Sequence, residues 1–535
     1  MPNRGARSLI LFLTLATPAA AMAQAEVPAD APLSAIDWLS DSVATPAGLP
    51  LPAPGPASGV PAGDIAASGV PAGDIAASAL PADVATLPLD AALPDTIGLI
   101  SAAEAGLPAD LWGTSPAADI ARRLSAEPLE MLPEMGALLR RVLLARLDPP
   151  VDASADTSLF LARVDRLLQQ GLLTEAAALL DRAPKDDPEI FRRAFDVALL
   201  TGAEDAACRT MRETPEISPT YPARIFCLAR GGDWQAAALT LETAKALGIL
   251  TEDEDHLLAR FLDPELFEGI DPPRPPQRPT PLTYRLFEAI GEPQATSGLP
   301  IAFARADLRD TSGWRARLLA AERLALTGAV SGGDLFRLYR ERRPAASGGV
   351  WDRAAAIQAL DAALADGDTA GVATALAPAW AAMQEMQLER LFAEEFAHRL
   401  PRASLPPESR ALAFRIGLMS TDFVAVATDH NPMSPDERYL VALARGLPAN
   451  APSTAPLPLA VRDGFVLQGV PPRYRQFVED DRRGEGLLLA INEFSDGAFG
   501  DYVKVTEAIA YLRYLGLDTA ARRAALELLV LERRG

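Results

Sequence analysis

The sequence has few of the residues on which most enzyme active sites depend. Its 535 residues include only two cysteines and three histidines, His256, His398 and His430. No His-x-x-x-His or His-Glu-x-x-His pattern occurs, so the sequence gives no support for a zinc site. A Cys–His nucleophilic pair would need a thiol that is free of any disulfide. We therefore expect no metal and no cofactor, and we expect each histidine to be a surface or core residue.

Long apolar runs are also missing after the first 23 residues. The densest later run, Leu487 to Ile491, has five residues, whereas a membrane-spanning helix needs about 20. The sequence therefore predicts no membrane span in the processed protein.

The first residues have the features of a secretory signal. Arg4 and Arg7 form a basic start, Leu9 to Ala16 form an apolar core, and a small-x-small site ends at Ala23. We expect cleavage between Ala23 and Gln24, which would leave a soluble periplasmic or secreted protein. The alternative is an uncleaved membrane anchor, but the apolar core is short for a span.

The chain has 50 basic and 71 acidic residues, which gives a net charge of −21. Without Arg4 and Arg7 the net charge is −23. Such a surface repels phosphate backbones, so we expect no nucleic-acid partner.

The two cysteines, Cys208 and Cys227, are 19 residues apart. In an exported chain this favours a disulfide, here between antiparallel neighbouring helices. Closing such a loop would stabilise the fold by about 3 kcal/mol in the chain-entropy model. The alternative is a pair of separate buried thiols.

The clearest pattern is a repeated spacing after glycines. Gly171, Gly202 and Gly232 lie 31 and 30 residues apart, and small or apolar residues follow each at plus five, plus nine and plus twelve. The three sets are Ala176, Leu180 and Ala183, then Ala207, Met211 and Thr214, then Ala237, Leu241 and Ala244. Steps of four and three place each set on one face of a helix, and a period near 30 predicts stacked helical pairs. The spacing recurs after Gly367 and Gly516. No convincing strand pattern occurs, so the predicted fold is all-α, an α-solenoid of helix pairs.

Residues 24–100 have a different composition. Twelve prolines occur there among alanine, glycine and serine, with Trp38 as the single aromatic residue, and a decapeptide repeats in tandem from Gly59 to Ser78. Such a composition cannot bury enough apolar area to fold, so we expect a disordered spacer. The alternative is a docking motif near Ile36 to Leu39.

The remaining chain divides by its proline content. We expect a signal peptide at 1–23, the disordered linker at 24–100, a helical block at 101–271, a polyproline strut at 272–281, a second helical block at 282–446, a Pro-rich break at 447–470 and a last helical block at 471–535.

Two resemblances follow from local motifs. Leu111-Trp112, the run from Leu138 to Ala145 and Asp148-Pro149-Pro150 resemble an uncharacterised group of exported alphaproteobacterial helical proteins, sometimes labelled antifreeze glycopeptide polyprotein. That resemblance implies no known activity and assigns no site residue. The positions after the glycines, with Pro184 and Pro215 just beyond two second helices, resemble degenerate tetratricopeptide repeats (TPR-like repeats), with a generic helical array as the alternative.

Three functions remain open from the sequence. The first is a non-enzymatic periplasmic scaffold or adaptor that binds a protein or peptide, because helical repeats expose extended binding surfaces. The second is a cell-wall glycan-binding or lytic enzyme with a degenerate site near Glu493, in the segment from Asn492 to Asp501, where acids, small residues such as Ser495 and Gly497, and aromatic residues are expected to interrupt a helix. The third is a passive envelope spacer. Arginine clusters at 340–343 and 473–475 and the acid run at 252–255 are expected to be solvated or helix-capping residues.

Overall fold

A computed structural model describes residues 93–153 and 157–531, and almost all of this part of the chain is helical. The helices of the first half are α2 (Ala102–Ala105), α3 (Ala117–Ala126), α4 (Pro133–Leu144), α5 (Ser158–Gln169), α6 (Leu173–Leu180), α7 (Pro188–Thr201), α8 (Glu204–Glu213), α9 (Tyr221–Arg230), α10 (Trp234–Ala246), α11 (Glu252–Leu262) and α12 (Pro281–Ala289). Those of the second half are α13 (Trp314–Leu326), α14 (Gly332–Arg340), α15 (Val350–Ala365), α16 (Thr369–Glu385), α17 (Glu389–Phe396), α18 (Pro407–Leu418), α19 (Phe423–Asp429), α20 (Pro435–Ala444), α21 (Pro456–Val466), α22 (Arg475–Glu479), α23 (Arg483–Gly497), α24 (Tyr502–Tyr514) and α25 (Asp518–Val530).

Short elements complete the described chain. The 3₁₀ helices are η1 (Pro94–Thr96), η2 (Pro215–Ile217), η3 (Pro264–Phe267), η4 (Thr296–Gly298), η5 (Ile301–Leu308), η6 (Arg402–Ser404), η7 (Pro448–Asn450) and η8 (Pro472–Tyr474). Two strands of two residues, β1 (Ile100–Ser101) and β2 (Ala145–Arg146), pair in parallel. The all-α prediction is confirmed for this part of the chain, and no helix in it is long and apolar enough to cross a membrane.

The predicted linker at 24–100 is wrong at its end. Residues 93–100 are ordered, and Asp95 in η1 is buried against α5. Its carboxylate accepts the Phe160 N–H at 3.0 Å, and its carbonyl accepts a bond from Arg163 at 3.1 Å. Asp95 therefore satisfies backbone donors in the first turn of α5, a role that composition does not reveal. The predicted cleavage site, Ala23 and Gln24, and the rest of the linker lie outside the described residues.

The glycine spacing marks helix pairs as predicted. Gly171, Gly202, Gly232, Gly367 and Gly516 all have φ between 66° and 84°, and each ends one helix just before the next begins. This left-handed conformation is the usual helix-ending role of glycine. The residues five, nine and twelve positions after these glycines are all buried except Ala207 and Thr214, which are half-buried.

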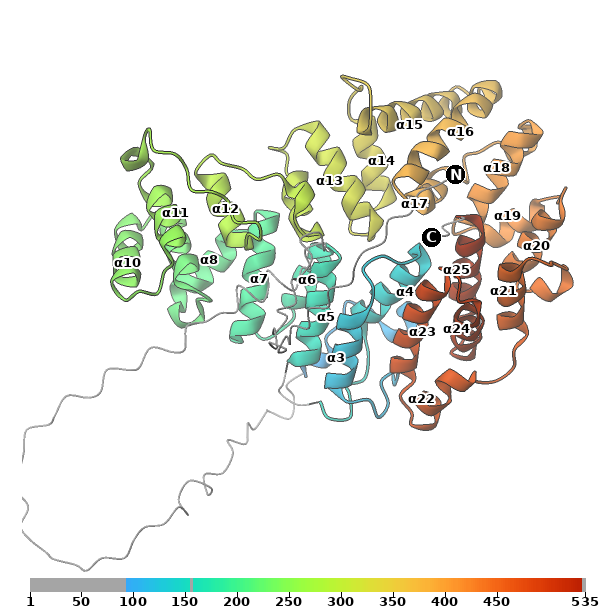
Figure 1. Cartoon of the computed structure of the whole chain (residues 1–535), viewed down its shortest axis with the longest axis horizontal. Coiled ribbons are helices and arrows are strands. Elements are labelled where there is room, and N and C mark those ends of the chain that lie inside the picture. Colours follow the sequence, from blue (N-terminus) through green and yellow to red (C-terminus); the bar gives the residue numbers. More distant parts are fainter. Residues whose placement is uncertain (1–92, 154–156, 532–535) are drawn as a thin grey trace, which may run out of the picture.

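The two ends of the described helical array contact each other. In Figure 1 the blue-to-cyan helices α3 and α4 lie beside the red helices α23 and α25, and these pairs are in contact. Gly484 donates its N–H to the Leu111 carbonyl at 2.8 Å, and the Trp112 ring lies where a side chain on Gly484 would stand. A solenoid whose repeats touch only their neighbours would keep these segments apart. We call the closed circuit of α3–α6, η5 and α13–α25 the closed array.

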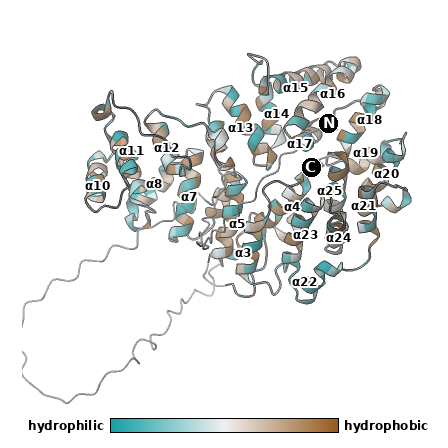
Figure 2. Cartoon of the chain, in the orientation of Figure 1, coloured by the Kyte–Doolittle hydropathy of each residue, from teal (hydrophilic) through white to brown (hydrophobic). Residues whose placement is uncertain are grey.

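A smaller region projects from the closed array. Helices α8–α11, with one face of α7 and of α12, form a second hydrophobic core that holds both cysteines; we call this region the disulfide lobe. Helix α7 joins the two cores, because Phe195 and Leu199 pack in the lobe while Val197 and Leu200 pack in the array. Hydrophobic and hydrophilic residues lie within the same helices (Figure 2), as expected for amphipathic helices that bury one face.

Two predicted boundaries do not match these cores. The polyproline stretch at 272–281 connects η3 to α12, and Leu282, Leu286 and Phe287 of α12 still belong to the lobe core, so the stretch does not separate two blocks. The predicted break at 447–470 contains helix α21, which begins at Pro456 and packs against α24. Proline is favoured in the first turn of a helix, so the prolines that suggested a break mark its start instead.

Candidate binding site

A large cavity lies on the inner side of the closed array. Its volume is about 1140 Å³, and its lining comes from α4, the turn between α5 and α6, η4 and η5, α13 and α14, and the turn between α16 and α17. Five arginines (Arg140, Arg141, Arg305, Arg323, Arg390) and five acids (Glu130, Glu175, Asp334, Glu385, Glu394) take part. The charges of this lining are therefore balanced, in contrast to the acidic chain as a whole. We call this space the central cavity.

Apolar side chains reach the surface of the central cavity. Leu129 is 46% exposed and Leu326 is 47% exposed, and both line it together with half-buried Met131, Ile301 and Met386. Exposed leucine and methionine side chains beside paired charges can bind an apolar ligand face while polar groups fix its orientation.

An ion-pair cluster at Arg390 holds one wall of the cavity. Arg390 Nη1 lies 2.9 Å from Glu134 of α4 and 2.9 Å from Glu527 of α25, and its Nε lies 3.1 Å from Glu394. Glu527 also accepts the Glu134 N–H at 2.7 Å, at the first turn of α4. One guanidinium thus joins α17 both to α4 and to α25, the last helix of the array.

The environment of this cluster shifts the protonation of its members. Burial acts to lower the pKa of Arg390, but Glu527 and Glu134 together hold that pKa above its usual value. Burial raises the pKa of Glu527 to about 7, and the neighbouring Glu134 adds to the rise while Arg390 opposes it. Two carboxylates share Arg390 here, and Glu134 also lies 3.1 Å from Arg523 and 3.4 Å from Arg141, so Arg390 stays charged and Glu527 holds its proton more tightly.

Two further arginines of this region, buried Arg166 and half-buried Arg140, bond to backbone carbonyls. Arg166 donates to the Glu127 and Pro128 carbonyls at 2.9 and 2.5 Å, and to the side chain of Gln169, which lines the cavity. Burial lowers the pKa of Arg166 to about 10 and raises that of Glu127 to about 8. Arg140 bonds to the Gly328 carbonyl at 2.7 Å and pairs with Glu175, which ties α4 to α6 and to the end of α13. The walls are thus fixed before any ligand binds.

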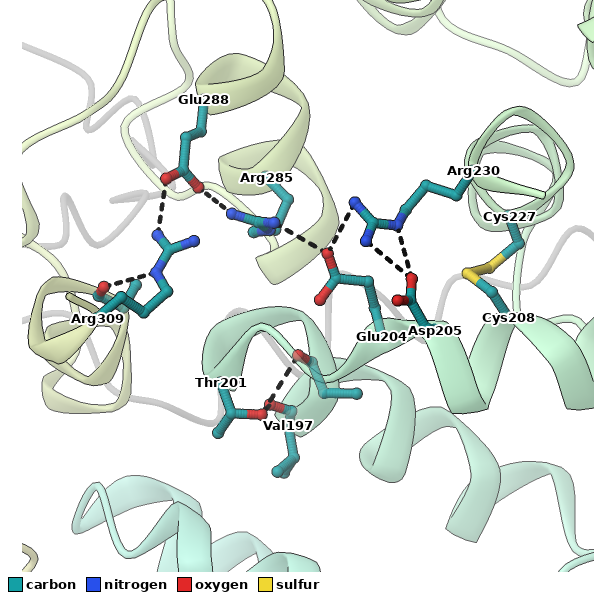
Figure 3. Close-up of polar contacts among 12 residues, drawn as sticks. Val197, Thr201, Glu204, Asp205, Cys208, Cys227, Arg230, Arg285, Glu288 and Arg309 are labelled. Atoms are coloured by element: carbon teal, nitrogen blue, oxygen red, sulfur yellow. Dashed lines mark hydrogen bonds and ion pairs between the residues drawn. A yellow bond between two sulfur atoms is a disulfide. The ribbon is translucent and has the colours of Figure 1, made fainter. Parts of the chain in front are cut away.

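A chain of ion pairs connects the disulfide lobe to this region (Figure 3). Arg230 lies 2.8 Å from Asp205 and 3.3 Å from Glu204, which is almost fully buried. Arg285 of α12 lies 2.9 Å from the same Glu204 and also pairs with Glu288. Glu288 in turn pairs at 2.8 Å with Arg309, directly after η5. These contacts fix the lobe against the array.

The predicted disulfide is confirmed. Cys208 of α8 and Cys227 of α9 are bonded, with Cα atoms 4.8 Å apart, and both side chains are buried. Glu204 and Arg230 lie one turn away from the two cysteines on these helices. The covalent link and the ion pair therefore hold the same helix pair together.

The segment near Glu493 differs from its prediction. Helix α23 runs without interruption through Glu493 and Asp496 to Gly497, so the expected break in the helix is wrong. Ser495 Oγ bonds to the Ile491 carbonyl at 2.9 Å within the helix, and Gly497 packs closely against Val505. The Glu493 carboxylate pairs with Arg473 at 3.4 Å and with Lys504 at 3.3 Å, and it lies outside the cavities described here.

The other polar clusters singled out in the sequence have structural partners. Thr251 and Glu254 form the expected capping box of α11, with the Glu254 N–H 3.2 Å from Thr251 Oγ1. Arg340 pairs with Asp361 and Glu395 at 2.7 Å each. His430 stacks on Phe414 and lies 3.0 Å from Glu437. Among the residues described, no group of three or more His, Cys, Asp or Glu side chains could hold a metal ion.

Comparison of the chain with protein-family models, with curated proteins and with solved structures finds no match. The central cavity was not predicted from sequence. Its walls depend on Arg390, whose partners are 256 and 137 residues away, and no local pattern points to such a contact.

Proposed function

We propose that this protein is an exported helical-repeat scaffold or adaptor that binds a protein or peptide partner of the cell envelope in its central cavity. The observation that carries the proposal is the cavity itself, about 1140 Å³, with exposed Leu129 and Leu326 beside balanced, pre-paired charges. Peptides present alternating apolar and polar groups, which such a lining fits. The buried disulfide supports export, because disulfides persist in oxidising compartments.

The repeat type and the family remain part of this proposal. The left-handed glycines and buried small residues support degenerate TPR-like helix pairs, and the resemblance through Leu111-Trp112 to exported alphaproteobacterial proteins agrees with an envelope location. The alternative function, a glycan binder or lytic enzyme at Glu493, would require this carboxylate to leave Arg473 and Lys504. Its test is muropeptide release by the purified protein compared with Glu493→Gln.

The cavity proposal is tested by photo-crosslinking at two positions of one helix. Leu326 lines the cavity, whereas Leu319, also on α13 and 37% exposed, does not. A photoreactive residue at 326 should capture a specific envelope protein in living cells, and the same residue at 319 should not. With the captured partner purified, Leu326→Glu should weaken binding about tenfold or more, because a charge replaces a buried apolar contact, while Leu319→Glu leaves it unchanged. Equal capture at both positions, or equal loss of affinity, would remove the proposal.

Export is tested separately. Periplasmic fractionation followed by N-terminal sequencing should recover a product that begins at Gln24. An unprocessed product in the cytosol would contradict the predicted signal.

A further inference from the structure

A second cavity adjoins the central one and has a different charge. It has a volume of about 890 Å³ and lies between the end of α7, η5, α13 and α14. Five arginines line it (Arg305, Arg309, Arg317, Arg337 and Arg340), against three carboxylates. Arg305, Ala329, Val330 and Asp334 line both cavities, so the two lie side by side. We call this second cavity the arginine groove. Its positive excess stands out in a chain of net charge −21.

Two of these arginines, Arg305 and Arg337, have donors that a ligand can use, whereas Arg317 pairs with Glu341 of the same groove at 3.0 Å. Arg305 donates to Thr174 Oγ1 at 3.4 Å, and within the described residues no carboxylate lies at ion-pair distance from it. Arg337 is 78% exposed, and its partner Asp334 is itself 54% exposed, so this pair contributes little and can rearrange. The Arg317 Nε is buried without a hydrogen-bond acceptor among the described residues.

The other two arginines belong to the wall. Arg309 is held by Glu288 at 2.8 Å, and Arg340 by Asp361 and Glu395. The groove therefore contains arginines whose guanidinium groups are held by carboxylates and arginines whose N–H groups can still bind a ligand. Such an arrangement recognises carboxylates.

The chain itself contains a segment of complementary charge. Residues 24–92 include eight acidic residues and no lysine or arginine. Two of the acids, Asp64 and Asp74, occupy the same position in the tandem decapeptide, and an isoleucine follows each of them. We propose that the arginine groove binds residues 59–78 of the same chain, with Asp64 and Asp74 as the groups that pair with its arginines.

The length of chain permits this contact. The described chain begins at Leu93, beside the first turn of α5, where Asp95 bonds to Phe160. The groove lies toward the other end of α5, since Arg305 of the groove donates to Thr174, five residues after that helix ends at Gln169. A helix of 12 residues is about 18 Å long. The 14 residues from 79 to 92 can span at most about 48 Å, so the length of chain allows residues 59–78 to reach the groove.

Arg305 lines both the groove and the central cavity, so the two surfaces adjoin. This inference concerns a different surface from the proposed partner site, and it can fail while the partner proposal stands.

The test uses the full chain with a photoreactive residue in place of Ile65. Crosslinks should map within one chain to η5 and α14. They should fall about tenfold in the double variant Arg305→Glu/Arg337→Glu, which corresponds to the loss of two charge-assisted contacts. The matched control reverses two arginines outside the groove, Arg122 on α3 and Arg462 on α21, and should leave the crosslinks unchanged. Equal circular dichroism and thermal midpoints of both variants show that the fold is kept.

Charge exchange sharpens the result. Adding Asp64→Arg and Asp74→Arg to the groove variant should restore the crosslinks, because opposite charges again face each other. Raising the salt concentration from about 50 mM to about 500 mM should weaken them in the unmodified chain. Crosslinks spread evenly over the molecule, or unaffected by Arg305→Glu/Arg337→Glu, would overturn the proposal. Crosslinks that form only between two chains would assign the groove to a second copy and would also overturn it.

Discussion

The closed array and the disulfide lobe are both built from packed helix pairs, but different contacts hold the helices of each region together. In the closed array α4, near the start of the described chain, meets α25, its last helix, and Arg390 joins the two through Glu134 and Glu527 without a covalent bond. In the disulfide lobe each helix packs mainly on its sequence neighbours, and a disulfide fixes α8 to α9. Closure therefore depends on contacts between distant residues, whereas the lobe depends on a local cross-link.

The difference is visible at the outer surface of the lobe. Five apolar side chains are each at least half exposed: Trp234 and Leu239 of α10, Leu247 directly after it, and Leu266 and Ile270 beyond α11. The end of a helical stack has no next repeat to cover its apolar face. In the closed array α4 and α25 cover each other, so their apolar faces are buried.

The largest effect is expected when the closure is broken. Arg390→Met removes the ion pair of buried Glu527, while Glu134 keeps Arg523 at 3.1 Å, so we expect a loss of about 3 kcal/mol in the free energy of unfolding. Hydrogen exchange should show the loss in α4, α17 and α25. Chemical denaturation of Arg337→Met, which removes an exposed ion pair, provides the control and should change stability by less than about 1 kcal/mol. If the two variants lower the free energy of unfolding equally, the Arg390 cluster stabilises the fold no more than an exposed ion pair does.

The next effect should be confined to the lobe. Removal of the disulfide by Cys208→Ala/Cys227→Ala should cost about 3 kcal/mol, because the unfolded chain regains the freedom of the closed loop. The amides of α8 and α9 should exchange faster while those of α13–α25 keep their protection. If the amides of the closed array exchange faster to the same extent, the lobe is not a separate cooperative unit.

These two regions differ in how far the sequence predicts them. The glycine turns, the disulfide and the cap at Thr251 follow from spacings of a few to about 20 residues, and all three are confirmed. Such features obey the geometry of a single helix or helix pair. The lobe, built from neighbouring helices, was therefore predictable in outline.

The closure was not predictable in the same way. The closure depends on three charged residues in amphipathic helices, namely Glu134, Arg390 and Glu527. The sequence around each of them does not differ from that around a charged residue on a solvated helix face. The central cavity depends on that closure, so it was missed as well. The error at Glu493 has a related cause, because Ser495 and Gly497 suggest a helix break in isolation but are held by Ile491 and Val505 in the fold.

A third effect is expected at the helix that joins the two regions. Asp196 of α7 is buried, and burial raises its pKa to about 7 although Arg192 and Arg193 oppose the rise. Its pKa in the unfolded chain is near 3.8, so the native state favours the protonated form. Ionisation of Asp196 therefore reduces stability progressively as the pH rises from about 4 to about 7, and the full loss is present above pH 7.

Asp196→Asn should remove this pH-dependent loss. We expect the variant to be more stable by about 1–3 kcal/mol at pH 8 and nearly unchanged below pH 4, as measured by urea denaturation across this range. Asp165→Asn is the control, because Asp165 pairs with Arg193 at 2.6 Å and its removal should destabilise at pH 8. A variant Asp196→Asn that is less stable at pH 8 would mean that the ionised carboxylate contributes a favourable contact.

The smallest effect compares the same chemical change in both regions. Thr251→Ala in the lobe and Ser434→Ala in the closed array each remove the side-chain oxygen that accepts an N–H in the first turn of a helix, at 3.2 and 3.1 Å. Each loss should cost about 1 kcal/mol. At α20, however, the Glu437 side chain still accepts the Met433 N–H at 2.7 Å and still lies 3.0 Å from His430 after the serine is replaced. At α11 the side-chain contact of Glu254 is with Thr251 itself, so it is lost with the threonine. We therefore expect the first turn of α11 to lose more hydrogen-exchange protection than that of α20, since the lobe has fewer contacts from distant parts of the chain to replace a lost cap.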